Sequence, residues 1–164
     1  MQPSTATTLT QGVTAGIVAY VAVALVLGGL DLLGGRGVLY SPALLGSVLL
    51  EGGADGCQLQ FRSSGFWAYT SIHLVMLMLF GLLAGWLIRG SEERPTLWFG
   101  ALLTFVMVAW HLTGAVLGLL APVQACLSLW SVTAAGFAGA LAMAAYLWWT
   151  HPRLRRALRG ERYA

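Results

Sequence analysis

Two histidines inside long apolar segments are the residues of this sequence best suited to chemistry. His73 lies in TSIHLVMLMLFGLLAGWLIRG, residues 70–90, and His111 in LWFGALLTFVMVAWHLTGAVLGLL, residues 97–120. Imidazoles from two helices can hold a haem iron axially, or bind a transition metal together with a third ligand. A neutral imidazole can also satisfy its N–H on a neighbouring backbone or hydroxyl oxygen, which serves packing alone. Both interpretations stay open at this point.

The two histidines are expected at the same depth in a bilayer. If their segments are neighbouring antiparallel helices, His73 and His111 both lie roughly 10–14 Å below the outer helix ends. A quinone could also hydrogen-bond at this depth. Other polar side chains are predicted at the same level and complete a small polar layer: Tyr69, Thr70, Thr113 and Ser131.

The two cysteines form a second pair with its own chemistry. Cys57 lies in the long first connection and Cys126 at the start of the last apolar segment. The same topology places both thiols on the outer, oxidising side, where a disulfide would fasten the connection to the bundle. The alternative is two free thiols. No C-x-x-C pair accompanies them, so a thiol-oxidase activity is not expected.

The composition requires a membrane environment for the elements that carry these residues. Of 164 residues, 58% are hydrophobic and only 9% are charged, whereas charged residues make up about 25% of a soluble domain. A span needs about 20 apolar residues. Four spans with short loops therefore fill one integral membrane domain, residues 1–164, and leave no room for a soluble catalytic domain.

The apolar runs predict an all-α membrane protein, a four-transmembrane-helix up-down bundle. Short links between the last three spans force them to be antiparallel neighbours. The expected spans are about 13–33, 66–88, 96–120 and 125–149.

A short extra helix is expected at about 41–52, in the first outer connection. Ser41 can cap it and Gly52 can end it, and it is too short to cross a membrane. At the end of the first span, Asp31 is expected to be solvated or paired with Arg36.

Arginine counts predict the orientation. All nine basic residues are arginine, and seven fall on one side of the predicted topology against two on the other. By the positive-inside rule both termini face the cytoplasm. The first 12 residues carry no basic side chain, so the first apolar run is expected to be a retained span. Five arginines form a basic tail at residues 150–164 that is expected to contact anionic lipid headgroups: Arg153, Arg155, Arg156, Arg159 and Arg162.

Small residues four positions apart predict close helix packing. Pairs occur in the second and third spans, and a triplet occurs in the fourth. The sets are Gly81 and Gly85, Gly114 and Gly118, and Gly136, Ala140 and Ala144. They favour a compact bundle.

Two short motifs carry a family resemblance. YSPALLG, Tyr40–Gly46, follows the first span, and HPRLR, His151–Arg155, closes the last one. In these motifs the chain resembles small, uncharacterised bacterial four-helix membrane proteins with a Tyr-Thr/Ser-Pro-Ala-Leu-Leu-Gly stretch. The resemblance implies a bacterial inner-membrane location and implies no activity.

The absence of catalytic motifs favours a non-enzymatic role. No phosphate-binding loop, zinc-protease helix or nucleophile elbow occurs in the sequence, and no folded domain is left to read nucleic acid. The sequence thus predicts an accessory or structural subunit of a larger, for example respiratory, membrane complex, with lipid and other membrane subunits as partners. The alternative is a b-type haem- or metal-binding subunit that uses His73 and His111 in electron transfer or a quinone-linked role.

Overall fold

The computed structural model of the chain describes residues 5–52, 63–93, 107, 118, 121, 126–152 and 155. Within these ranges the protein is all-helical, without strands. The four described helices are α1 (Thr5–Leu33), α2 (Tyr40–Glu51), α3 (Ser63–Glu93) and α5 (Leu129–Thr150).

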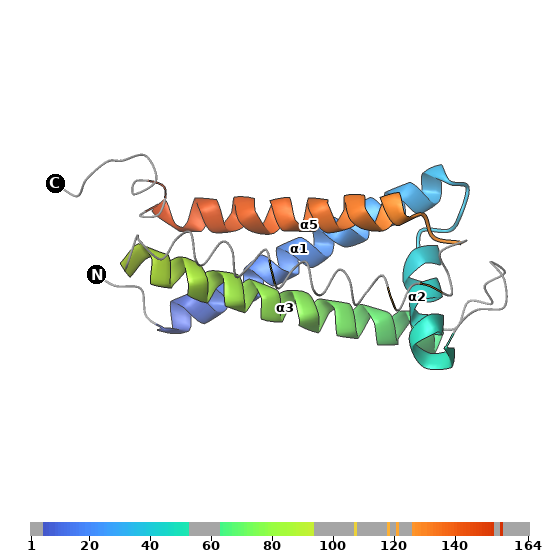
Figure 1. Cartoon of the computed structure of the whole chain (residues 1–164), viewed down its shortest axis with the longest axis horizontal. Helices are drawn as coiled ribbons and strands as arrows, with labels where there is room; N and C mark the ends of the chain where they lie inside the picture. Colours follow the sequence, from blue (N-terminus) through green and yellow to red (C-terminus); the bar gives the residue numbers. More distant parts are fainter. Residues whose placement is uncertain are drawn as a thin grey trace.

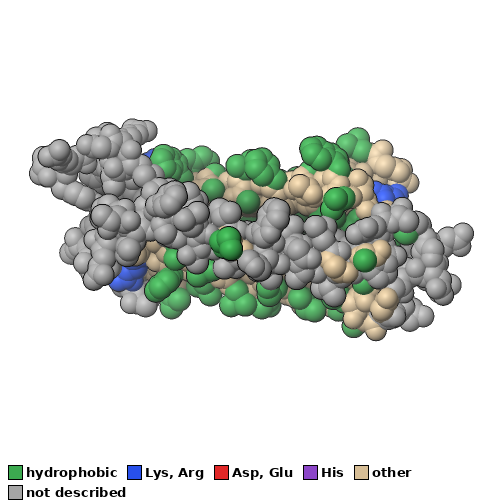
Figure 2. Space-filling model, in the orientation of Figure 1, with side chains coloured by type: hydrophobic (Ala, Val, Ile, Leu, Met, Phe, Trp, Pro, Cys, Tyr) green, Lys and Arg blue, Asp and Glu red, His purple; other side chains and the backbone are tan. Residues whose placement is uncertain are grey.

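Three described helices are long and apolar enough to cross a membrane: Thr7–Leu33, Ser63–Ser91 and Leu129–Thr150. Figure 2 shows hydrophobic side chains along the length of the molecule, with arginine atoms near its two ends. The helices and their apolar surface together confirm the all-α, membrane-type character expected from the composition. The expected span at 96–120 lies outside the described residues, apart from Met107 and Gly118.

The first and third helices extend beyond the expected spans. α1 begins at Thr5 rather than near residue 13, and α3 continues to Glu93 rather than ending near residue 88. In the polar early turns of α1, Thr14 Oγ1 satisfies its hydrogen bond within the helix, at 2.9 Å from the carbonyl oxygen of Thr10. A helix therefore does not end where its hydrophobic residues end.

α1 lies between α3 and α5 and packs against both (Figure 1). Near the start of α1, Gly12 contacts Gly81 of α3, while Tyr20 lies beside His73. Later residues of α1 thus contact earlier residues of α3, so the two helices are antiparallel. The contact of Gly139 with Ala19 belongs to a second antiparallel interface, between α1 and α5. Consequently α3 and α5 are parallel to each other.

Glycines set the close approach of α1 to α3. A Cβ added at Gly12 would stand 2.8 Å from the Cα of Leu82, which is too close for any side chain. Gly16 and Gly81 would meet backbone atoms of the facing helix in the same way. The small-residue face at Gly81 and Gly85 thus packs against a second one, Gly12 and Gly16, and dispersion contacts between the two backbones stabilise the pair.

α5 turns a different face toward α1 than its small-residue triplet suggests. Its buried residues are Ser131, Ala135, Gly139, Met143 and Leu147. Gly136, Ala140 and Ala144 are exposed, and a Cβ added at Gly136 would meet no atom within 4 Å. The triplet therefore lies on the outer side of α5.

α2 lies across the end of the bundle at which α1 ends and α3 begins (Figure 1). Its residues Ala43, Leu44 and Leu45 are buried, and the backbone of Gly46 touches that of Gly65 in α3. The helix ends at Gly52, whose left-handed φ of 75° lets its N–H donate to the carbonyl oxygen of Val48. The sequence places this helix at 41–52, and α2 spans Tyr40–Glu51.

Candidate functional site

Two groups of polar side chains lie near the end of the bundle that α2 covers. The first, which we call the clasp, consists of Asp31, Arg36, Ser41 and the backbone of Cys126. The second, which we call the aromatic cluster, consists of Tyr20, Tyr69 and His73. They come from different helices, so each depends on the tertiary fold.

Asp31 is the centre of the clasp. It lies two residues before the end of α1 and is only 1% exposed. Gly35, with φ 69°, turns the chain so that Arg36 comes back to Asp31, and Arg36 Nη2 lies 3.2 Å from Asp31 Oδ1. Of the two alternatives expected for Asp31, the pairing with Arg36 is confirmed.

Asp31 also caps α2. Its Oδ2 accepts a hydrogen bond from the backbone N–H of Ser41, and its Oδ1 accepts one from the Ser41 hydroxyl, both at 2.9 Å. The expectation that Ser41 caps α2 is therefore wrong, and Leu39 occupies the cap position without a side-chain hydrogen bond. A carboxylate satisfies the free N–H groups of a first turn better than a hydroxyl, since its charge also favours the positive end of the helix dipole.

Arg36 extends the clasp to the last helix. Its Nη1 donates a 3.0 Å hydrogen bond to the carbonyl oxygen of Cys126, just before α5. Its guanidinium carbon stands 4.7 Å from the centre of the Tyr40 ring, in cation–π contact. These charged groups therefore hold α1, α2 and the start of α5 together. Asp31 is buried, and both of its carboxylate oxygens have partners within the clasp.

Cys126 is half-buried at the edge of the clasp and is not a free thiol. The chain's other cysteine, Cys57, lies outside the described residues. The bridge between them stays a prediction.

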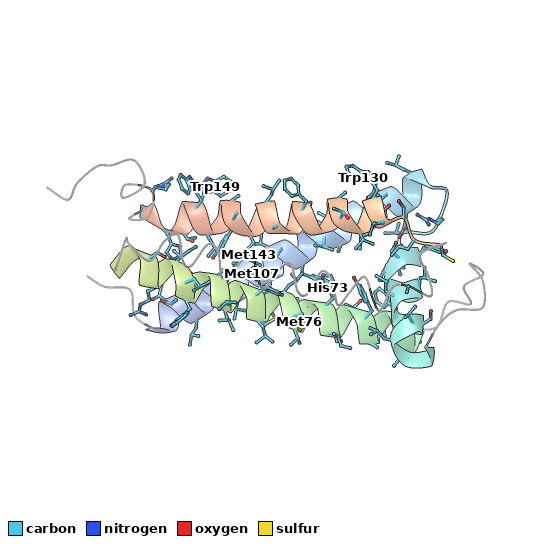
Figure 3. The ribbon with its side chains drawn as sticks, viewed as in Figure 1. His73, Met76, Met107, Trp130, Met143 and Trp149 are labelled. Atoms are coloured by element: carbon cyan, nitrogen blue, oxygen red, sulfur yellow. The ribbon has the colours of Figure 1, made fainter. Side chains whose placement is uncertain are left out.

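The aromatic cluster surrounds the histidine of α3. The His73 ring centroid lies 5.1 Å from that of Tyr69, one helical turn away, and 6.1 Å from that of Tyr20 on α1. Figure 3 shows His73 between α3 and α1. Tyr69 also packs against Leu44 and Leu45 of α2.

The structure places the predicted polar layer as follows. Tyr69 and His73 lie side by side, Thr70 is half-buried beside them on α3, and Ser131 is buried on α5. His111 and Thr113 lie outside the described residues. Sequence reasoning missed Tyr20, although it is the only aromatic residue in α1.

The opposite end of the bundle holds the remaining described basic groups. His151 ends α5, is 6% exposed, and its Nδ1 lies 3.0 Å from the carbonyl oxygen of Leu147. Arg89 Nη1 donates a 3.2 Å hydrogen bond to Thr8 Oγ1, which ties α3 to the start of α1. Of the predicted basic tail, Arg155 is described and half-buried, and the other four arginines lie outside the described residues.

The donor set around His73 determines what it could bind. Its ring neighbours in the described ranges are tyrosines, and those ranges contain no group of three His, Cys, Asp or Glu residues that could hold a metal ion. Haem ligation needs His111 as well, so it stays a prediction.

No family model, curated protein or solved structure shows significant similarity to this chain. The resemblance carried by Tyr40–Gly46 and His151–Arg155 stays a prediction. The function must therefore be inferred from the residues and their contacts.

Proposed function

We propose that the chain is a non-enzymatic, four-span protein of the bacterial inner membrane and an accessory or structural subunit of a larger, for example respiratory, membrane complex. The observation that carries the proposal is the contrast between its polar groups and its surface. The charged groups of the clasp are used to fasten helices to one another, while the outer side of α5 presents apolar side chains and small residues to its surroundings.

The outer side of α5 favours a helical partner. Trp130, Phe137 and Leu141 are 73%, 66% and 54% exposed. Beside this stripe runs the triplet Gly136, Ala140 and Ala144, which lets a neighbouring backbone approach closely. Lipid alone requires apolar side chains, whereas a small-residue stripe among large ones also suits a second helix.

The direction of the described helices supports a fourth span. α3 ends at the end of the bundle where α1 begins, and α5 starts at the opposite end, beside Arg36. The chain between these two ends contains the segment 96–120, which by its sequence is apolar and long enough to span a membrane.

The arginine distribution supports cytoplasmic termini. In that orientation the clasp and α2 lie on the outer side, where cysteines become oxidised. The state of Cys126, which is not a free thiol, supports a disulfide with Cys57 there.

The subunit role is tested by native purification in mild detergent. We expect a discrete complex larger than the monomer, which Gly136→Leu and Ala140→Leu weaken while the monomer keeps its helical circular dichroism. Gly29→Leu is the matched control, because a Cβ added at Gly29 also meets no atom within 4 Å. Recovery of a monomer alone, even after cross-linking in intact membranes, would contradict the proposal.

A b-type haem- or metal-binding subunit remains the second candidate, because His73 points into the bundle between Tyr20 and Tyr69. An optical spectrum of the purified protein separates the two. A Soret band that disappears in both His73→Ala and His111→Ala would favour haem binding. A colourless, metal-free preparation would exclude it.

A further inference from the structure

Tyr20, Tyr69 and His73 lie together and make no side-chain hydrogen bond within the residues that the structure describes. The part of the chain that the structure describes gives them ring contacts with one another. Asp31, Ser41, Arg89 and His151, by contrast, are all hydrogen-bonded. Among the described side chains, Arg36 Nε is the fully buried polar atom that lacks a hydrogen-bond partner. The polar atoms of the aromatic cluster are therefore not fully buried.

Two tyrosines and a histidine whose rings lie together without an acceptor among the described side chains need a hydrogen-bond partner in a membrane. His73 lies ten residues into α3, about 15 Å along the helix axis from its start at Ser63. At that depth the bilayer supplies no hydrogen-bond acceptor, and an unpaired polar group there is unfavourable. A bound molecule with acceptor oxygens would satisfy the donors of the cluster.

The surroundings of the cluster select the kind of molecule. Tyr69 packs against the cluster that Leu44 and Leu45 of α2 form with Leu127, so α2 closes one side of the aromatic cluster. The charged side chains described at this end, Asp31 and Arg36, are paired with each other. The site thus fits a neutral, lipid-soluble molecule better than a charged headgroup.

We propose that Tyr20, Tyr69 and His73 form a binding site for the ring of a membrane quinone. The hydroxyls of Tyr20 and Tyr69 and the N–H of His73 donate hydrogen bonds to its carbonyl oxygens. Quinones combine a planar ring, which packs well against aromatic side chains, with two neutral acceptors and an apolar tail that stays in the lipid. The site is one of binding and involves no electron transfer. It does not depend on the proposed subunit role.

Binding of decylubiquinone to the purified full-length chain in lipid nanodiscs tests the proposal. We expect saturable binding of one molecule per chain, weakened about 2- to 10-fold by each of Tyr20→Phe, Tyr69→Phe and His73→Phe, because each removes one hydrogen bond. The matched control is Tyr146→Phe, a half-buried tyrosine of α5 that packs against the central core, and its affinity should be unchanged. Circular dichroism melting curves check that each variant folds.

A second probe separates hydrogen bonding from simple partitioning. Decylbenzene has the same tail and a ring without carbonyl groups, and it should show no saturable binding. Equal uptake of both compounds, or equal decylubiquinone affinity in all four variants and the unaltered chain, would overturn the proposal and leave water as the partner of the cluster. Haem coordinated by His73 in the purified chain would overturn it as well.

Discussion

Asp31 at the end of α1 and Ser41 at the start of α2 are joined by two hydrogen bonds of 2.9 Å, from the backbone N–H and the hydroxyl of Ser41. Asp31 is also the ion-pair partner of Arg36. One buried carboxylate therefore fixes both the turn after the first span and the position of the helix that covers the bundle.

Asp31→Ala is predicted to destabilise the bundle by about 3–5 kcal/mol, because it leaves Arg36 without its partner and α2 without its cap. Ser41→Ala should cost only about 1 kcal/mol, since the backbone bond to Asp31 remains. Thermal unfolding in micelles, followed by circular dichroism, measures both. Unaltered stability of Asp31→Ala would show that the clasp is dispensable.

Arg36→Ala and Asp31→Ala are predicted to be strongly non-additive. Either change alone leaves one buried or half-buried charge uncompensated, whereas the double variant removes both charges. The double variant should therefore lose clearly less stability than the two single variants together. Strict additivity in the same unfolding measurement would mean that the two side chains do not interact.

Gly16→Ala is predicted to separate α1 from α3 and to cost about 1–3 kcal/mol, because a Cβ at this position would overlap the backbone at Leu77 and Met78. Gly29→Ala, in the same helix, should be neutral or stabilising by up to about 1 kcal/mol, since open space surrounds Gly29. Denaturation curves of the pair provide the comparison. Equal effects would contradict the glycine interface.

A disulfide between Cys57 and Cys126 is predicted to stabilise the protein by about 2–4 kcal/mol. Mass spectrometry of the alkylated, unreduced protein should find both thiols blocked, and both should become reactive after reduction. Cys57→Ser should then release Cys126 for alkylation without reduction. Rapid alkylation of both thiols in the untreated protein would exclude the bridge.

The helical class and the apolar segments could be predicted from the sequence, and the helix ends could not. Composition and run length were sufficient to identify α1, α3 and α5. Thr5 to Gln11, however, are polar enough to suggest a loop, and the structure continues α1 through them. Polar residues near a membrane surface can belong to a helix or to a loop, so the polar sequence before residue 13 did not determine where α1 begins.

The rotation of each helix about its own axis was the second feature that could not be predicted from the sequence. α5 is apolar on every side, so no hydrophobic stripe marks its inner face. The triplet at Gly136, Ala140 and Ala144 suggested one face, but the structure turns Gly139 toward Val23 of α1. Shape rather than polarity decides between two such faces.

The neighbours of His73 show the same limit. Tyr69 precedes it by one turn, so their contact follows from helix geometry alone. Tyr20 needs the register of α1 against α3, which Gly12 and Gly16 set by meeting Gly81. Gly12 and Gly16 are four residues apart, as are Gly81 and Gly85. This shared spacing was the signal that could have predicted the contact between α1 and α3. Asp31 was likewise unpredictable as the cap of α2, because the contact depends on the turn at Gly35.

The orientation of the bundle is the claim on which the proposed roles of the cysteines and of the basic tail both depend. Single cysteines at Gly37 and Gly90 test it, in a chain with Cys57→Ser and Cys126→Ser, since a Cβ at either glycine meets no atom within 4 Å. A membrane-impermeant maleimide added to intact cells should label Gly37→Cys and should reach Gly90→Cys only after the membrane is opened. Labelling of Gly90→Cys in intact cells, with Gly37→Cys protected, would contradict the account.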